Sequence, residues 1–178
     1  MKIIVDPIGF IIFCDQRMRC ALGRGGLNAH KREGDGATPI GEFRLGRVFY
    51  RPDRQAHPPT TGLRSHEITP NMGWCDDPSH ADYNRLITLP HPAHHETLWR
   101  DDHVYDLIVE ILYNTENIKA GLGSAIFMHV AKPEYTPTEG CIALSYDDLS
   151  VLLRMCNDGD VVVVPEPTTD LSAYGFGA

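Results

Sequence analysis

The sequence predicts a β-rich α+β protein, either a sandwich or a mixed sheet, with one main helix packed against the strands. Short β-prone runs bounded by turn residues recur along the chain and amount to roughly seven to nine strands. A single amphipathic helical stripe lies near the C-terminal end, and the strict strand–helix alternation of a doubly wound parallel sheet is missing. The chain has 178 residues, which at about 150 residues per domain predicts one domain over residues 1–178.

The N-terminal third is predicted to consist of strands and turns. Apolar runs at residues 3–5 and 10–14 flank the turn sequence Pro7-Ile8-Gly9, and this arrangement predicts a hairpin. A third strand is expected at residues 19–22. A polar, glycine-rich loop follows over residues 23–37.

The middle of the chain gives weaker signals. Residues 42–50 begin with alternating apolar side chains and shift phase at Gly46, which predicts a strand with a bulge. Residues 51–80 hold five prolines and follow no clear period, and such a long irregular stretch is usually functional or mobile. We expect a short strand at residues 85–89 and a helical turn within residues 90–102.

Clearer signals return in the C-terminal half. Residues 105–113 are largely apolar on both faces, which is typical of a central strand, and residues 125–130 are expected to form another buried strand. The main helix is expected at residues 145–157, where a capping pattern at Ser145 precedes an apolar stripe at helical spacing. A last buried strand follows at residues 160–164.

Composition and charge argue against several functions. The chain carries 16 Lys and Arg against 24 Asp and Glu, a formal net charge of −8, which argues against binding nucleic acid or an anionic membrane surface. Its longest apolar runs fall far short of the ~20 residues of a membrane-spanning helix. No secretory leader is visible, so we expect a cytoplasmic protein, or a periplasmic one if a leader was removed. The five cysteines are odd in number and are expected to be reduced thiols.

Cys141 is the cysteine whose surroundings favour chemistry. Gly140 permits a tight turn that points amide groups at an incoming oxygen, and a helix is expected shortly after Cys141, where the helix dipole favours a thiolate. His129 lies twelve positions upstream on a buried strand and is the residue type that deprotonates a thiol. Composition and spacing leave an alternative equally open, in which Cys141 is a small core residue and His129 a hydrogen-bonded buried histidine.

Three segments in a fixed order resemble the YkuD-like family, the L,D-transpeptidase catalytic domain. They are GATPIGEF at residues 36–43, SAIFMH at residues 124–129 and TEGCI at residues 138–142. The closing strand after Gly159 also fits, so the resemblance covers about residues 36–164. It implies a mixed β-sandwich whose main helix follows the catalytic cysteine.

The resemblance also implies an activity. Cys141 would be the nucleophile and His129 the general base, with an oxyanion hole at the Gly140 and Cys141 amides and with no metal or organic cofactor. The substrate would be a peptidoglycan stem tetrapeptide, cleaved between the L-centre of meso-diaminopimelate and the terminal D-Ala. We expect release of D-Ala to water, an L,D-carboxypeptidase reaction of murein recycling. The alternatives are an L,D-transpeptidase that forms cross-links or exchanges D-amino acids, and an inactive module that binds murein fragments.

Polar residues elsewhere are candidates for holding this substrate, because its carboxylates would suit an Arg and its amine an acid. The candidates are Tyr83, Asn84, Arg85, His95, Glu96, Arg100, Lys132 and Thr138.

A zinc hydrolase is a third hypothesis, with His91, His94 and Cys75 as candidate ligands. Pro92 disfavours a helix between the two histidines, and the sequence has neither an HExxH nor a CxxC pattern. We therefore expect a polar loop here and no metal site. The sequence leaves the oligomeric state open.

Overall fold

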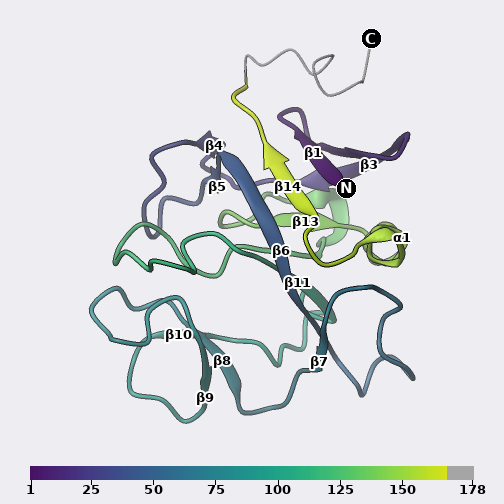
Figure 1. Cartoon of the computed structure of the whole chain (residues 1–178). Coiled ribbons are helices and arrows are strands. Elements are labelled where there is room, and N and C mark those ends of the chain that lie inside the picture. Colours follow the sequence, from purple (N-terminus) through teal and green to yellow (C-terminus); the bar gives the residue numbers. More distant parts are fainter. Residues whose placement is uncertain (168–178) are drawn as a thin grey trace.

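A computed structural model describes residues 1–167 of the chain. Within them, nine strands form one mixed sheet (Figure 1). The strands lie in this order: β11 (Leu107–Ile111), β12 (Phe127–Val130), β13 (Ile142–Leu144), β3 (Gln16–Ala21), β2 (Phe10–Phe13), β1 (Lys2–Asp6), β14 (Val161–Val164), β6 (Gly41–Tyr50) and β7 (Ser65–Glu67).

Strand β6 closes this sheet on itself. Its first half pairs antiparallel with β14 and its second half with β11, which stands at the other end of the strand order, while β7 adds in parallel beside the second half. The register with β11 shifts opposite Glu110, where β6 carries an extra residue. The bulge predicted at Gly46 is thus confirmed, and a Cβ there would lie 2.8 Å from Glu110 Oε2, so a larger residue would displace that side chain.

The main hydrophobic core lies on the face of the sheet against which α1 (Tyr146–Met155) packs. The Ser145 side chain caps this helix by accepting the Asp148 N–H at 3.1 Å, as the sequence predicts. Leu149, Leu152 and Leu153 are the buried stripe. The helix ends before the predicted boundary because Cys156 already has an extended backbone.

A smaller lobe covers part of the opposite face. It is built on the antiparallel sheet β10 (His95–Thr97), β8 (Met72–Cys75) and β9 (Leu86–Thr88), at the bottom of Figure 1. Trp74 of β8 packs edge-on against Phe127 of the large sheet, with ring centroids 5.0 Å apart. A second buried cluster of aromatic and aliphatic side chains, which includes Cys141, joins this lobe to the large sheet.

The predicted fold class is confirmed, since the described residues form a β-rich fold with a single α-helix. The hairpin of β1 and β2 and the central strand β11 are also confirmed. The helical turn expected within residues 90–102 is wrong, because β10 forms there by pairing with β8. The irregular stretch at residues 51–80 contains β7 and β8, whose partners lie elsewhere in the chain.

The remaining short elements lie close to the site described below. Strand β4 (Leu27–Asn28), within the predicted glycine-rich loop, pairs in parallel with β5 (Thr38–Pro39) directly after it, and a short 3-10 turn covers Pro133–Tyr135. Strand β13 was not predicted. Among residues 1–167, every helix is too short or too polar to cross a membrane.

Candidate active site

Two neighbouring parallel strands bring Cys141 and His129 to one face of the large sheet. In the register of β12 and β13, His129 lies opposite Ala143 and Met128 opposite Ile142. Side chains alternate along a strand, so Cys141, two residues before Ala143, points to the same side as His129. This is the face that the small lobe covers.

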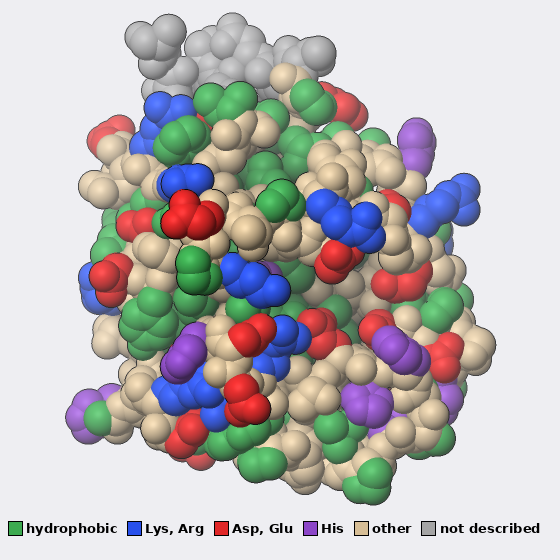
Figure 2. Space-filling model, turned by 180° about the vertical axis from the view of Figure 1, so that it is seen from behind, with side chains coloured by type: hydrophobic (Ala, Val, Ile, Leu, Met, Phe, Trp, Pro, Cys, Tyr) green, Lys and Arg blue, Asp and Glu red, His purple; other side chains and the backbone are tan. Residues whose placement is uncertain are grey.

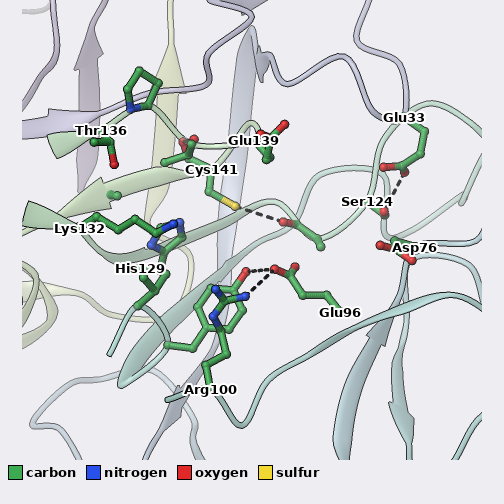
Figure 3. Close-up of a pocket in the computed structure, with 16 residues that line it drawn as sticks. Glu33, Asp76, Glu96, Arg100, Ser124, His129, Lys132, Thr136, Glu139 and Cys141 are labelled. Carbon is green, nitrogen blue, oxygen red and sulfur yellow. Dashed lines mark hydrogen bonds and ion pairs between the residues drawn. The ribbon is translucent and has the colours of Figure 1, made fainter. Parts of the chain in front are cut away.

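A cavity of about 280 Å³ lies between the large sheet and the small lobe. Cys141 and His129 both line it, and Figure 3 shows them facing the same space. Of the predicted substrate-binding residues, Glu96, Arg100, Lys132 and Thr138 also line it. The geometry therefore favours a functional role for Cys141 and His129 over the alternative of two unconnected core residues.

The Cys141 thiol is buried and protonated in this structure. Only 9% of the residue is exposed, and Sγ donates to the Ala125 carbonyl at 3.2 Å while accepting the Phe127 N–H at 3.4 Å. Burial, with a smaller contribution from the Glu96 carboxylate, raises its pKa to about 12. Because β13 separates Cys141 from α1, the helix dipole that the sequence suggested does not act directly on the thiol.

His129 has the tautomer that a general base needs. Its Nδ1 lies 2.9 Å from the Val130 carbonyl oxygen, which can only accept, so Nδ1 carries the hydrogen and Nε2 keeps its lone pair. Burial lowers the pKa of His129 to about 4, which keeps the ring neutral. The Val130 carbonyl is thus the third group that orients the imidazole.

Tyr105 is a site residue that the sequence analysis missed. Its ring packs edge-on against His129 with centroids 5.5 Å apart, and its hydroxyl donates to Glu96 Oε1 at 2.7 Å. The Arg100 guanidinium lies over the Tyr105 ring and 3.7 Å from the Glu96 carboxylate, and it also binds Asp102. This network fixes one wall of the cavity, and burial raises the pKa of Glu96.

The two sides of the cavity differ in charge. Lys132 and Thr136 lie on one side of Cys141, and Glu33, Ser124 and Asp76 on the other (Figure 3). The Glu33 carboxylate accepts hydrogen bonds from the Tyr83 hydroxyl and from Ser124 Oγ, the latter at 2.7 Å. The acidic side was not predicted, although Ser124 belongs to one of the three motif segments. One side therefore suits an anionic group of a ligand and the other a cationic group.

The outer surface shows no comparable segregation of charge on the face turned away in Figure 1. Acidic and basic side chains are interspersed there over the described residues, and most visible histidines lie over the lower half, the region of the small lobe (Figure 2).

Four predicted substrate-binding residues lie outside the cavity wall. Arg85 is exposed, and His95 Nδ1 is 2.8 Å from the Ala93 carbonyl. Tyr83 is buried behind the cavity, where it supports Glu33. Asn84 is also buried, and its amide is occupied by four hydrogen bonds within the protein.

Gly140 and Thr138 shape the turn before Cys141. Gly140 has φ of +126°, and a Cβ there would lie 2.7 Å from the Ala37 carbonyl oxygen, so glycine is required. Thr138 Oγ1 accepts the Gly140 N–H at 3.2 Å and donates to the Cys141 carbonyl at 2.6 Å. The Gly140 amide is therefore engaged in this structure, and an oxyanion hole that uses it requires this bond to exchange.

The histidines of the small lobe gather differently from the predicted zinc arrangement. His80, Asp82 and His91 bring ligand atoms within 4.8 Å of one another, whereas His94 pairs with Asp76 at 2.5 Å. Nδ1 of His80 accepts the Asp82 N–H and Nδ1 of His91 accepts the Ala93 N–H. Each neutral ring then carries its hydrogen on Nε2, so this arrangement does not fit a cation without breaking those bonds.

Comparison with protein families identifies the family of the chain. The model of the L,D-transpeptidase catalytic domain, YkuD, matches residues 15–164. The chain belongs to this family. The match includes the strands that carry Cys141 and His129 as well as the whole small lobe. No curated protein matches the chain.

Several solved structures are similar to this YkuD domain in fold. The helical cell shape determining protein Pgp2 from Campylobacter jejuni is 14% identical with a TM-score of 0.48, and the match covers 94% of this chain and 48% of that one. L,D-transpeptidase 1 from Mycobacterium tuberculosis is 14% identical with a TM-score of 0.42, covering 93% and 58%. An L,D-transpeptidase from Mycobacterium smegmatis is 15% identical with a TM-score of 0.43, covering 93% and 58%. The chain thus spans about half the length of these proteins.

Proposed function

We propose that this YkuD domain catalyses acyl transfer on peptidoglycan stem tetrapeptides through a thioester on Cys141, with water as the acceptor. The observation that carries this proposal is the placement of the Cys141 thiol and the His129 imidazole on one face of paired strands, lining one cavity. Membership of the L,D-transpeptidase catalytic domain family supports the substrate class.

The first half of the reaction starts from a neutral pair. The Cys141 thiol leaves its hydrogen bond to the Ala125 carbonyl and donates instead to Nε2 of His129. Nε2 accepts the thiol proton as Sγ attacks the carbonyl carbon of the L-centre. Backbone N–H groups at the turn before β13 stabilise the oxygen of the tetrahedral intermediate. When the C–N bond breaks, His129 returns the proton to the departing amine of D-Ala and leaves the thioester.

The second half reverses these roles with water. His129 takes a proton from water, the hydroxide attacks the thioester, and the proton passes to sulfur as the C–S bond breaks. Water needs no further room in the cavity of about 280 Å³ once the acyl group is bound at Cys141, and this is consistent with hydrolysis. The products are a tripeptide and D-Ala.

Transfer to an amine is the second candidate, and the acidic side of the cavity favours it. Glu33 and Asp76 lie across the cavity from Lys132, so an ammonium group of an acceptor would meet carboxylates there. In that reaction the acceptor amine replaces water and forms a new amide, as in cross-linking or D-amino acid exchange.

Product analysis separates these reactions. The protein is incubated with a murein tetrapeptide ending in D-Ala, with and without a second D-amino acid, in water enriched in 18O. Hydrolysis gives tripeptide with one 18O in its new carboxylate, and amine transfer gives an exchanged product without it. Cys141→Ala is the test variant, and Cys14→Ala, which removes an exposed cysteine, is the matched control.

The proposal expects turnover that Cys141→Ala abolishes and Cys14→Ala retains. Exchange as the dominant reaction would favour the second candidate. Turnover that survives Cys141→Ala would refute the nucleophile, and tight binding of the peptide without turnover would indicate a murein-binding module.

A further inference from the structure

Lys31 is a buried cation behind the turn that carries Cys141. Its side chain is 4% exposed, and Nζ donates to Asp35 Oδ1 at 2.7 Å and to the Arg32 carbonyl at 3.4 Å. Burying an ammonium group costs free energy that a single ion pair often fails to recover. The burial of this lysine in the predicted glycine-rich loop therefore needs a functional explanation.

The Lys31 side chain passes between two glycines of the site. A Cβ on Gly123 would lie 2.8 Å from Lys31 Cε, and a Cβ on Gly140 would lie 3.4 Å from Lys31 Nζ. Both glycines have φ in the left-handed region, at +104° and +126°. Gly123 begins the segment whose Ala125 carbonyl accepts the thiol hydrogen, and Gly140 directly precedes Cys141. The Lys31 side chain thus lies next to both segments, with Cε beside Gly123 and Nζ beside Gly140.

We propose that Lys31 is a positioning residue for Cys141: its ammonium group holds the turn at Gly140 and stabilises the negative charge that Sγ acquires during attack. Two of its N–H groups have partners among the described residues, and Nζ lies next to Gly140 in the turn before Cys141. This inference rests on the proposed function only in assigning attack to Cys141.

The other charged and titratable groups around the thiol leave Lys31 with a distinct role. Glu96, from β10, raises the pKa of Cys141 and Lys31 lowers it. His129 stays neutral, with its pKa lowered to about 4 by burial, and burial holds Tyr105 in its neutral form by raising its pKa. Asp35 offsets part of the Lys31 charge but is itself held by the Arg32 and Ala37 amides.

Thiol alkylation tests this role without requiring turnover. Lys31→Met keeps an unbranched side chain of similar length and removes the charge, while Lys119→Met removes an exposed lysine and is the matched control. Each protein is treated with iodoacetamide from pH 7 to 9.5, and labelling of each cysteine is followed by mass spectrometry. Cys20 and Cys156 are internal references, because both are buried and burial raises the pKa of each to about 12.

The proposal expects Lys31→Met to slow labelling of Cys141 by about three- to tenfold at fixed pH, since a tenfold change corresponds to one pKa unit. Cys20 and Cys156 should keep their rates. Asp35→Asn, which removes the counter-ion and keeps the lysine, should speed labelling of Cys141 relative to the same references.

Loss of packing alone has the opposite sign, since a loosened fold exposes Cys20, Cys141 and Cys156 together and speeds the labelling of all of them. That pattern, or an unchanged Cys141 rate, would overturn the proposal. Failure of the proposed function has a separate signature, turnover that survives Cys141→Ala.

Discussion

Replacing Asn84 should destabilise the contact between the small lobe and the large sheet. Asn84 Oδ1 accepts the Trp74 Nε1–H at 3.0 Å and the Ala125 N–H at 3.1 Å, and its amide donates to the carbonyls of Tyr113 and Asn114. Asn84→Gly leaves two buried donors without partners, at about 1–3 kcal/mol each, so we expect a loss of about 2–6 kcal/mol of unfolding free energy. Asn84→Ala should lose a further ~1 kcal/mol, because Asn84 has φ of +56° and alanine is strained there.

Urea unfolding followed by tryptophan fluorescence measures these losses, since Trp74 is buried in the affected contact. Asn71→Ala is the matched control: the Asn71 side chain is exposed and, among the described residues, accepts a hydrogen bond from Thr69 alone, so this variant should lose no more than about 0.5 kcal/mol of unfolding free energy. Cys141 should also label faster in Asn84→Gly, because the Ala125 carbonyl that holds its thiol is released. A loss below about 1 kcal/mol for Asn84→Gly, with an unchanged slope against urea, would refute the reasoning.

Three further predictions concern the site itself. His129 has a folded-state pKa of about 4 against 6.5 for the free side chain. Lowering the pH from 7.5 to 4.5 should therefore cost about 2.5 kcal/mol of unfolding free energy, because the unfolded state takes up the proton. Urea unfolding of His129→Asn should lack this pH dependence, and an equal pH dependence in both proteins would contradict the prediction. Gly140→Ala should destabilise more than Gly121→Ala, because both have positive φ but only the Gly140 Cβ meets a carbonyl oxygen, at 2.7 Å; equal melting temperatures would show that the turn yields. Glu96→Gln should lower the pKa of Cys141 and speed its alkylation at pH 8, since the Glu96 carboxylate raises that pKa; slower labelling would show that Glu96 acts through packing.

The elements that the sequence predicted correctly are those whose own residues show a recognisable pattern. Strands β1, β2, β6 and β11 and helix α1 show clear apolar periodicity or a cap, and the structure forms all of them. Strands β7, β8, β10 and β13 have three or four residues each and form because a distant strand supplies their hydrogen bonds. Local patterns do not contain that information.

The site residues also differ in whether the sequence alone could identify them. The motif segments identified His129 on β12 and Cys141 directly before the adjacent strand β13. Glu33, Asp76 and Tyr105 come from segments remote in the chain, and only the folded structure brings them to the cavity. Asn84 was predicted as a substrate contact from its residue type, whereas its amide is used entirely inside the protein.

Because the small lobe lies between β7 and β11 in the chain, changes to the ligand-binding wall can occur separately from changes to Cys141 and His129. Residues 72–100 supply Asp76, Glu96 and Arg100 to the cavity as one continuous stretch, while His129 on β12 and Cys141 just before β13 lie outside that stretch. Substitutions or exchanges within the stretch can therefore change which ligands fit while the proposed reacting pair keeps its place on the large sheet. A domain built in this way can diversify its choice of ligand during evolution and keep the same chemistry.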